Sequence, residues 1–154
     1  MKKIVTLAVV VAVQATLVGA AVAPQLSARA TGDTYAFNVA PVDPIDPFRG
    51  AYVRLGYPDL QRAETLSYGD GPVYITLVEE DGVMVADDYQ RQRPSGDQPY
   101  LACEDGWQVR CGIESLFLSQ DDAAAMDEVL GDGAIAEVRV DGRGHAALID
   151  VRAP

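Results

Sequence analysis

The 154-residue chain has few of the residues on which enzymes most often rely. Lysine does not occur after Lys3, His145 is the single histidine, and Cys103 and Cys111 are the two cysteines. A Ser–Lys dyad is therefore excluded beyond the N-terminus, and no serine stands in a Gly-x-Ser-x-Gly sequence. A metal site needs more ligands than two cysteines and one distant histidine. From the sequence we assign no catalytic residue, no metal and no cofactor.

Basic residues are also scarce, and no acid precedes Asp33. The chain has 12 Lys and Arg against 23 Asp and Glu, a net charge of -11. Because such a chain repels phosphate backbones, nucleic acid is not an expected partner. Hydrophobic residues make up 49% and charged residues 23%, which is typical of a globular domain and excludes a disordered chain or a multi-pass membrane protein.

The uncharged stretch is concentrated at the N-terminus, over residues 4–28. About 20 apolar residues span a hydrocarbon core of roughly 30 Å, and Lys2 and Lys3 before them favour a cytoplasmic N-terminus. The run is longer than a usual signal-peptide core, which favours an anchor. Ala21-Val22-Ala23 nevertheless fits a signal-peptidase site, although the following Pro24 disfavours cleavage. A transmembrane anchor in the bacterial inner membrane and a cleaved signal for periplasmic secretion both stay open, and both place the domain outside the cytoplasm.

We divide the chain into an anchor or signal segment (1–23), a linker (24–32) and an exported domain (33–154). Residues 24–32 are small, polar and interrupted by Pro and Gly, which predicts a linker or stalk.

Alternating apolar residues predict that the exported domain is mainly β. Turn residues, above all Asp-Gly pairs, separate the expected strands. The fold class is therefore β-rich α+β, an antiparallel sheet or barrel-like domain with one short helix. The expected strands are 34–40, 51–57, 73–80, 83–86, 100–103, 107–113, 134–141 and 145–151, with a loop over 87–99 and a helix from Ser119 to Gly131.

The two cysteines lie on opposite arms of the hairpin expected around Asp105-Gly106. In an oxidising compartment such a pair closes a disulfide. We therefore predict a structural disulfide between Cys103 and Cys111.

A proline-rich segment precedes the second expected strand. Asp43-Pro44 and Asp46-Pro47 predict two turn-like units, and Arg49 lies close enough in sequence to bridge either carboxylate. Gly50 permits an unusual backbone angle or a close approach. One interpretation is a rigid loop held by an Asp–Arg pair. The other is a recognition surface for a partner or ligand, formed by Asp43, Asp46 and Arg49.

This segment and the Gly50-Ala51-Tyr52-Val53-Arg54-Leu55-Gly56-Tyr57 octapeptide after it resemble the bacterial GDYXXLXY-domain family. A second match is Cys111-Gly112-Ile113-Glu114. The resemblance implies an envelope protein with an N-terminal membrane segment, close to multi-pass membrane proteins, and it implies no activity. The motif aspartate is Ala51 here. The positions that carry the resemblance, and that form the expected interaction surface, are Asp43, Asp46, Arg49, Gly50, Tyr52, Leu55, Tyr57, Gly112 and Glu114.

Three functions remain. The first is a non-enzymatic, membrane-anchored envelope module that binds another membrane or periplasmic protein, such as a multi-pass membrane protein. The second is a domain that binds a small ligand or cation, with Tyr52, Tyr57, Tyr74 and Trp107 as pocket walls. The third is a hydrolase that uses carboxylates such as Glu114 and Asp46.

Overall fold

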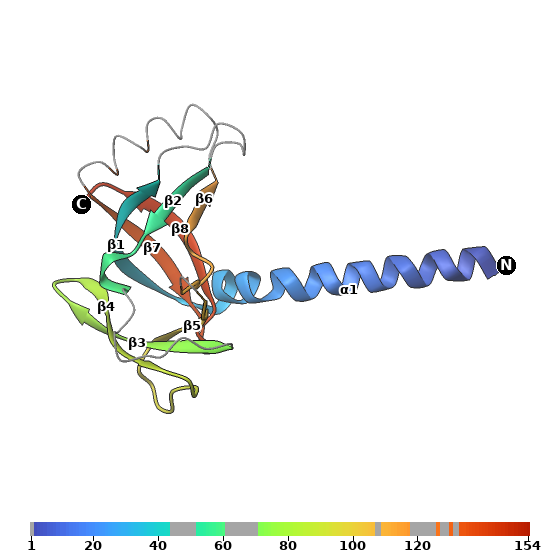
Figure 1. Ribbon diagram of the computed structural model, residues 1–154, viewed down its shortest axis with the longest axis horizontal. Helices are drawn as coiled ribbons and strands as arrows, with labels where there is room; N and C mark the ends of the chain where they lie inside the picture. Colours follow the sequence, from blue (N-terminus) through green and yellow to red (C-terminus); the bar gives the residue numbers. More distant parts are fainter. Residues whose placement is uncertain are drawn as a thin grey trace.

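The structure is a computed structural model, and it describes residues 2–43, 52–60, 71–106, 109–117, 126, 130 and 133–154. One long helix, α1 (Lys2–Thr31), leads into an antiparallel β domain (Figure 1). The sheets of this domain are nearly barrel-shaped, as the alternation of apolar residues predicts. The expected mainly β fold with an apolar N-terminal helix is confirmed.

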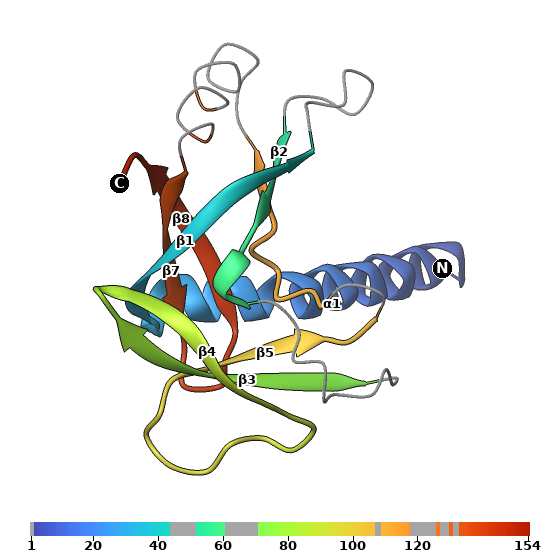
Figure 2. The same ribbon diagram turned by 60° about the vertical axis from the view of Figure 1, so that its left-hand side comes forward.

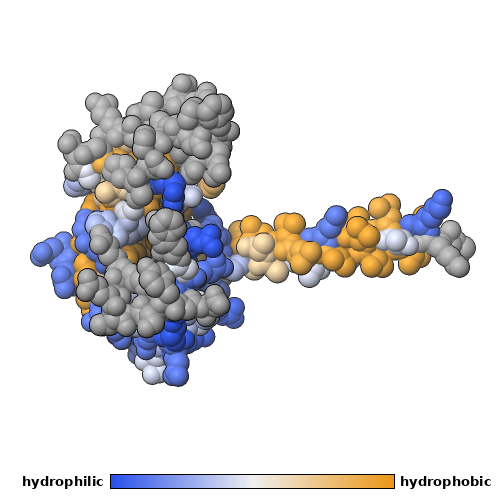
Figure 3. Space-filling view, in the orientation of Figure 1, coloured by the Kyte–Doolittle hydropathy of each residue, from blue (hydrophilic) through white to orange (hydrophobic). Residues whose placement is uncertain are grey.

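Helix α1 is 30 residues long, which corresponds to about 45 Å at 1.5 Å per residue. Its apolar side chains from Ile4 to Val22 are exposed, and they form the hydrophobic rod that projects from the domain (Figure 3). It is the one helix in the described ranges that is long and apolar enough to cross a membrane, a test that a signal sequence also passes.

The segment predicted as a linker or stalk, residues 24–32, is helical up to Thr31, because α1 continues through Pro24. Proline removes one helical N–H and disfavours a helix interior. Contacts of the following turns with the domain compensate for this cost. Ala28 is fully buried against the domain, and the Gln25 side chain donates to the carbonyl of Gly112 at 3.0 Å.

The end of α1 meets the domain at close quarters. The Gly32 N–H donates to the Ala28 carbonyl at 2.9 Å. A Cβ atom at Gly32 would lie 2.6 Å from that carbonyl oxygen and 2.8 Å from the carbonyl carbon of Val140, so no larger residue fits here without displacing backbone. The Arg139 side chain donates to the carbonyl of Arg29 in the last turn of the helix and to that of Gly32 just after it.

Five strands form the larger sheet, in the order β6-β2-β1-β7-β8. All its neighbouring pairs are antiparallel. The alternation that predicts these strands places Phe37 and Val39 of β1 in the core, together with Val53 and Leu55 of β2. The five strands are β1 (Asp33–Asp43), β2 (Tyr52–Gly56), β6 (Ser115–Phe117), β7 (Ala134–Val140) and β8 (Ala146–Arg152).

Three strands form the smaller sheet, in the order β4-β3-β5, and they lie beneath the larger sheet in Figure 2. They are β3 (Pro72–Glu80), β4 (Val83–Gln90) and β5 (Tyr100–Glu104). The β3–β4 hairpin turns at Asp81-Gly82 as predicted, with φ of 51° and 83°. Strand β4 runs four residues beyond the expected end at Ala86, into the segment predicted as loop, because a register shift at Thr76/Leu77 lets polar residues keep pairing with β3.

The two sheets share one core and are joined at the β7–β8 turn. Ile75, Leu77 and Leu101 of the smaller sheet are fully buried in the same cluster as Phe37 and Val138 of the larger one. The Ala102 N–H of β5 donates to the Gly144 carbonyl at 2.8 Å, and the Tyr100 hydroxyl donates to the Gly142 carbonyl at 3.2 Å.

Two further expectations meet the structure only in part. Of the helix predicted from Ser119, the structure describes Met126 and Leu130, and both are helical. The second arm of the predicted 100–113 hairpin is not a strand over 109–113, where pairing is limited to a single bridge between Glu104 and Arg110. The segment turns instead toward β6, because the Glu114 side chain binds backbone N–H groups within it.

Candidate functional site

Strand β2, with Tyr57 directly after it, carries the part of the octapeptide motif that the structure describes. Leu55 is in the core, and Arg54 is exposed on the opposite face. The backbone of Tyr52 pairs with Phe117 of β6, and that of Asp43 pairs with Arg54. Asp46, Arg49 and Gly50 lie outside the described residues, as do the side chains of Asp43 and Tyr52. The recognition surface proposed for the proline-rich segment therefore stays a prediction.

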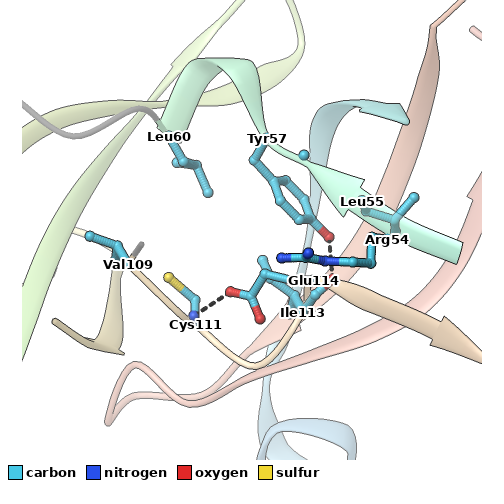
Figure 4. Close-up of a pocket in the computed structure, with 9 residues that line it drawn as sticks. Arg54, Leu55, Tyr57, Leu60, Val109, Cys111, Ile113 and Glu114 are labelled. Atoms are coloured by element: carbon cyan, nitrogen blue, oxygen red, sulfur yellow. Dashed lines mark hydrogen bonds between the residues drawn. The ribbon is translucent and has the colours of Figure 1, made fainter. Parts of the chain in front are cut away.

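A cleft of about 150 Å³ opens beside β2 (Figure 4). One wall comes from the end of β2 and the short 3-10 helix η1 (Pro58–Leu60). The other comes from residues 109–114, which we call the clasp loop. The lining of the cleft combines apolar side chains with the polar groups of Arg54, Tyr57 and Glu114. The lining residues are Arg54, Leu55, Gly56, Tyr57, Leu60, Val109, Cys111, Ile113 and Glu114.

Tyr57 closes one side of the cleft as a part-buried hydrogen-bond donor. Its hydroxyl donates to the Ile113 carbonyl at 2.8 Å, and its ring packs edge-on against Phe37 with centroids 6.1 Å apart. Burial, and secondarily the charge of Glu114, raise the pKa of Tyr57 far above its usual value of 10.0. The phenol therefore stays protonated at neutral pH and links β2 to the clasp loop.

Glu114 points into the cleft and braces the clasp loop (Figure 4). Its carboxylate accepts the N–H of Cys111 and, at 3.0 Å, the N–H of Gly112. Its carbonyl accepts the N–H of Leu55 at 2.9 Å. Both carboxylate oxygens thus accept hydrogen bonds from the backbone of the clasp loop. Gly112 and Glu114, which carry the second match to the family, are therefore joined in one loop conformation. The other carboxylate named in the hydrolase hypothesis, Asp46, lies outside the described residues.

The predicted disulfide is present between Cys103 of β5 and Cys111 of the clasp loop, with Cα atoms 4.2 Å apart. Two backbone hydrogen bonds between Glu104 and Arg110, of 2.8 Å and 3.0 Å, lie next to it. The bond therefore ties the wall of the cleft to the smaller sheet.

A second cluster of polar groups joins α1 to the β7–β8 turn, and sequence reasoning missed it. Asp141 is 6% exposed, and its carboxylate is the acceptor at the centre of the cluster. It accepts the Ser27 hydroxyl at 2.5 Å and the backbone N–H groups of Arg143 and His145 at 2.9 Å and 3.0 Å. The Nδ1 atom of His145 lies 3.0 Å from the same carboxylate. The Asp-Gly turn was predicted, but nothing in the sequence connects it to Ser27, 114 residues away.

Opposing effects act on the pKa of Asp141. Burial raises it, but the hydrogen bonds from Ser27, Arg143 and His145 stabilise the charged form more strongly. The pKa of Asp141 is therefore below its ordinary value of 3.8. At neutral pH the carboxylate is ionised and holds the helix to the turn.

The aromatic residues predicted as walls of a single pocket do not meet in the described part of the structure. Tyr57 lines the cleft, whereas Tyr74 contacts the Tyr100 ring at a centroid distance of 5.9 Å on the smaller sheet. Trp107 and the side chain of Tyr52 are outside the described residues. Among the residues that the structure describes, no group of three His, Cys, Asp or Glu side chains is arranged to hold a metal ion.

Comparison with known proteins identifies one family. The family described as GDYXXLXY protein matches residues 14–151, which is nearly the whole chain. No curated protein and no solved structure matches the sequence.

Proposed function

Because this chain belongs to the GDYXXLXY family, we propose that it is a non-enzymatic, membrane-anchored domain of the bacterial envelope that binds another membrane or periplasmic protein. The observation that carries the proposal is the continuity of α1. Its first two-thirds are exposed and apolar, while its last turns are docked on the domain. The helix thus combines a membrane-compatible surface with a firm attachment.

The attachment disfavours cleavage at a later small-x-small sequence, Ala28-Arg29-Ala30, whereas cleavage after Ala23 would keep it. Cleavage after Ala30 would remove Ser27, whose hydroxyl binds Asp141, and Arg29, whose guanidinium donates to the Leu148 carbonyl at 3.0 Å. Lys2 and Lys3 before the apolar run favour a cytoplasmic N-terminus and a domain on the periplasmic side.

The intact mass of the protein purified from its own membranes tests the anchor. We expect the full-length mass in the membrane fraction. A mass that begins near Ala21, Pro24 or Thr31 would contradict anchoring and indicate a free periplasmic domain.

The surface best suited to a partner is a groove between the two edges of the larger sheet, which we call the β6–β8 groove. Its volume is about 320 Å³, and it lies beside the docked end of α1. Phe117 and Ile149 are 79% and 38% exposed. Contact with a partner would remove their apolar surface from water, which favours binding. The lining residues are Gln25, Arg29, Gly112, Ser115, Leu116, Phe117, Leu148 and Ile149.

A photo-crosslinking amino acid at position 117, in native membranes, tests this binding surface. We expect a crosslink to one membrane or periplasmic protein, identified by mass spectrometry. The same probe at exposed Asp97, on the smaller-sheet side, is the control and should give no such product. An Ile149→Asp change, on the opposite wall of the groove, should reduce the crosslink at least fivefold. Equal products at positions 117 and 97 would contradict the assignment.

The cleft supports a second candidate, the binding of a small ligand. Its volume of about 150 Å³ suits a compact molecule with one apolar part, packed against Leu60 and Ile113. A thermal-shift screen of small metabolites and cations tests this function. A stabilising ligand should lose its effect in an Ile113→Ala variant; a screen with no stabilising compound would leave the interaction module as the better account.

A further inference from the structure

The clasp loop joins three parts of the molecule through consecutive residues. Cys111 is bonded to Cys103 of β5. The carbonyl of Gly112 accepts the Gln25 side chain of α1 at 3.0 Å, and the carbonyl of Ile113 accepts the Tyr57 hydroxyl at 2.8 Å. A change in the position of this loop would therefore alter both the cleft and the docking of the helix.

The covalent bond is the strongest tie between the clasp loop and the smaller sheet. The Glu114 carboxylate holds Cys111 and Gly112, which are within the loop itself, so it fixes the shape of the loop and not its distance from β5. The ion pair between Arg110 and Glu104, at 3.2 Å, has side chains that are 71% and 79% exposed, and exposed pairs contribute little. Without the disulfide, the two Glu104–Arg110 backbone hydrogen bonds remain.

The two sulfur atoms differ in accessibility. Cys103 is 3% exposed and belongs to the core. Cys111 is half-buried, and it lines both the cleft and a second hollow that extends to Pro24 and Gln25 of α1. Cys111 is therefore the more exposed cysteine of the pair, so we expect an external thiolate to attack its sulfur, with the sulfur of Cys103 as the leaving group.

We propose that the Cys103–Cys111 disulfide is a redox-sensitive clasp that controls the cleft and the docked end of α1 together. The reductant is a dithiol. Its first thiolate attacks the Cys111 sulfur, the S–S bond breaks, and Cys103 leaves as a thiolate that takes up a proton. Its second thiol then attacks the mixed disulfide, which releases the Cys111 thiol and leaves the reductant as a disulfide. Two electrons pass from the dithiol to the protein. The loop then moves away from β5 and loosens its contacts with Tyr57 and Gln25.

Hydrogen exchange of the full-length protein in detergent, with and without dithiothreitol, tests the clasp. We expect reduction to raise the exchange rates of the Arg110, Cys111 and Gly112 amides at least tenfold. Amides at residues 25–31 should exchange about three to ten times faster, while β7, which lies between β1 and β8 in the larger sheet, should not change.

The double variant Cys103→Ser/Cys111→Ser is the matched control. It should exchange like the reduced protein, and dithiothreitol should have no further effect on it. Equal loop exchange in oxidised and reduced protein would overturn the proposal. So would a loss of protection throughout β7, which would make the bond a staple of the whole fold, or a disulfide that dithiothreitol reduces only after the protein unfolds.

Discussion

Asp141 and Glu114 are two carboxylates with the same kind of bonding in different surroundings. Each accepts backbone N–H groups near it in the sequence, and each stabilises a segment that contacts α1. Asp141 is almost fully buried and binds the Ser27 hydroxyl directly, whereas Glu114 is half-buried in a loop that a disulfide also holds. The β7–β8 turn thus depends on polar contacts in the interior. The clasp loop has covalent support beside its polar contacts, so single substitutions should affect the two segments unequally.

Replacing Asp141 should have the largest effect. Asp141→Ala leaves the N–H groups of Arg143 and His145 and the Ser27 hydroxyl without their acceptor, and all three hydrogen bonds are part-buried. We expect the free energy of unfolding to fall by about 3 kcal/mol in total, since a fully buried donor left unpaired costs roughly 1–3 kcal/mol and these three are only part-buried. Urea unfolding of the full-length protein in detergent, followed by tryptophan fluorescence, measures this loss. Asp150→Ala, at an exposed position of β8, is the control, and a similar loss there would contradict the assignment.

Acid should reduce the same contribution without a mutation. Because the pKa of Asp141 is lowered in the folded protein, its contribution to stability is complete above about pH 4, the ordinary range of an aspartate. The contribution is lost as the pH falls through the pKa of the folded state. In urea unfolding between pH 6 and pH 2, the wild-type protein and an Asp141→Asn variant should therefore approach each other in stability. A difference that stays constant over this range would show that the Asp141 charge is not involved.

Glu114→Gln should have a smaller effect than Asp141→Ala. The glutamine keeps one carbonyl acceptor but presents an amide donor to the second N–H group, and the disulfide keeps the loop close to β5. We expect a loss of about 1–2 kcal/mol in the same urea assay. Glu104→Gln, at an exposed side chain, is the control. In the reduced protein the loss at Glu114 should be larger, and an equal loss in both redox states would contradict the supporting role of the disulfide.

Tyr57→Phe should have the smallest effect of the four. It removes one hydrogen bond to the Ile113 carbonyl and keeps the edge-on packing against Phe37. The expected loss of unfolding free energy is about 1 kcal/mol. Because burial against Phe37 holds the ring in place, amide exchange should increase at Glu114 and not in β1. Increased exchange in β1 would mean that the hydroxyl supports the core itself.

Local signals predicted the features that depend on neighbouring residues. Asp81-Gly82 set the β3–β4 hairpin, because both residues tolerate the positive φ of a tight turn. Alternation placed Phe37 and Leu55 in the core. The position of the two cysteines on opposite arms of an expected turn, in a chain expected to be exported, indicated the disulfide, and the structure contains it.

Features that depend on distant residues were not predictable. Pro24 and Gly32 favoured a linker, yet the helix continues because Asp141, Arg139 and Leu148, all more than 100 residues away, bind its last turns. Glu114 was considered as a catalytic carboxylate because a sequence does not show which backbone N–H groups surround a side chain. Its role as a brace follows from the loop conformation alone.

The close packing at Gly32 affects the orientation of the domain relative to α1 as well as the stability of the protein. Gly32, directly after α1, lies against the backbone of Val140 in β7, and Arg139 of β7 donates to its carbonyl. These contacts leave no room for the helix to rotate relative to the domain. Successive residues of a helix are about 100° apart around its axis. If one side of α1 contacts a neighbouring helix inside the bilayer, that contact therefore fixes the rotation of the attached domain about the helix axis. In an anchored chain, the direction in which the β6–β8 groove faces is therefore determined by the side of α1 that binds a neighbouring helix in the membrane.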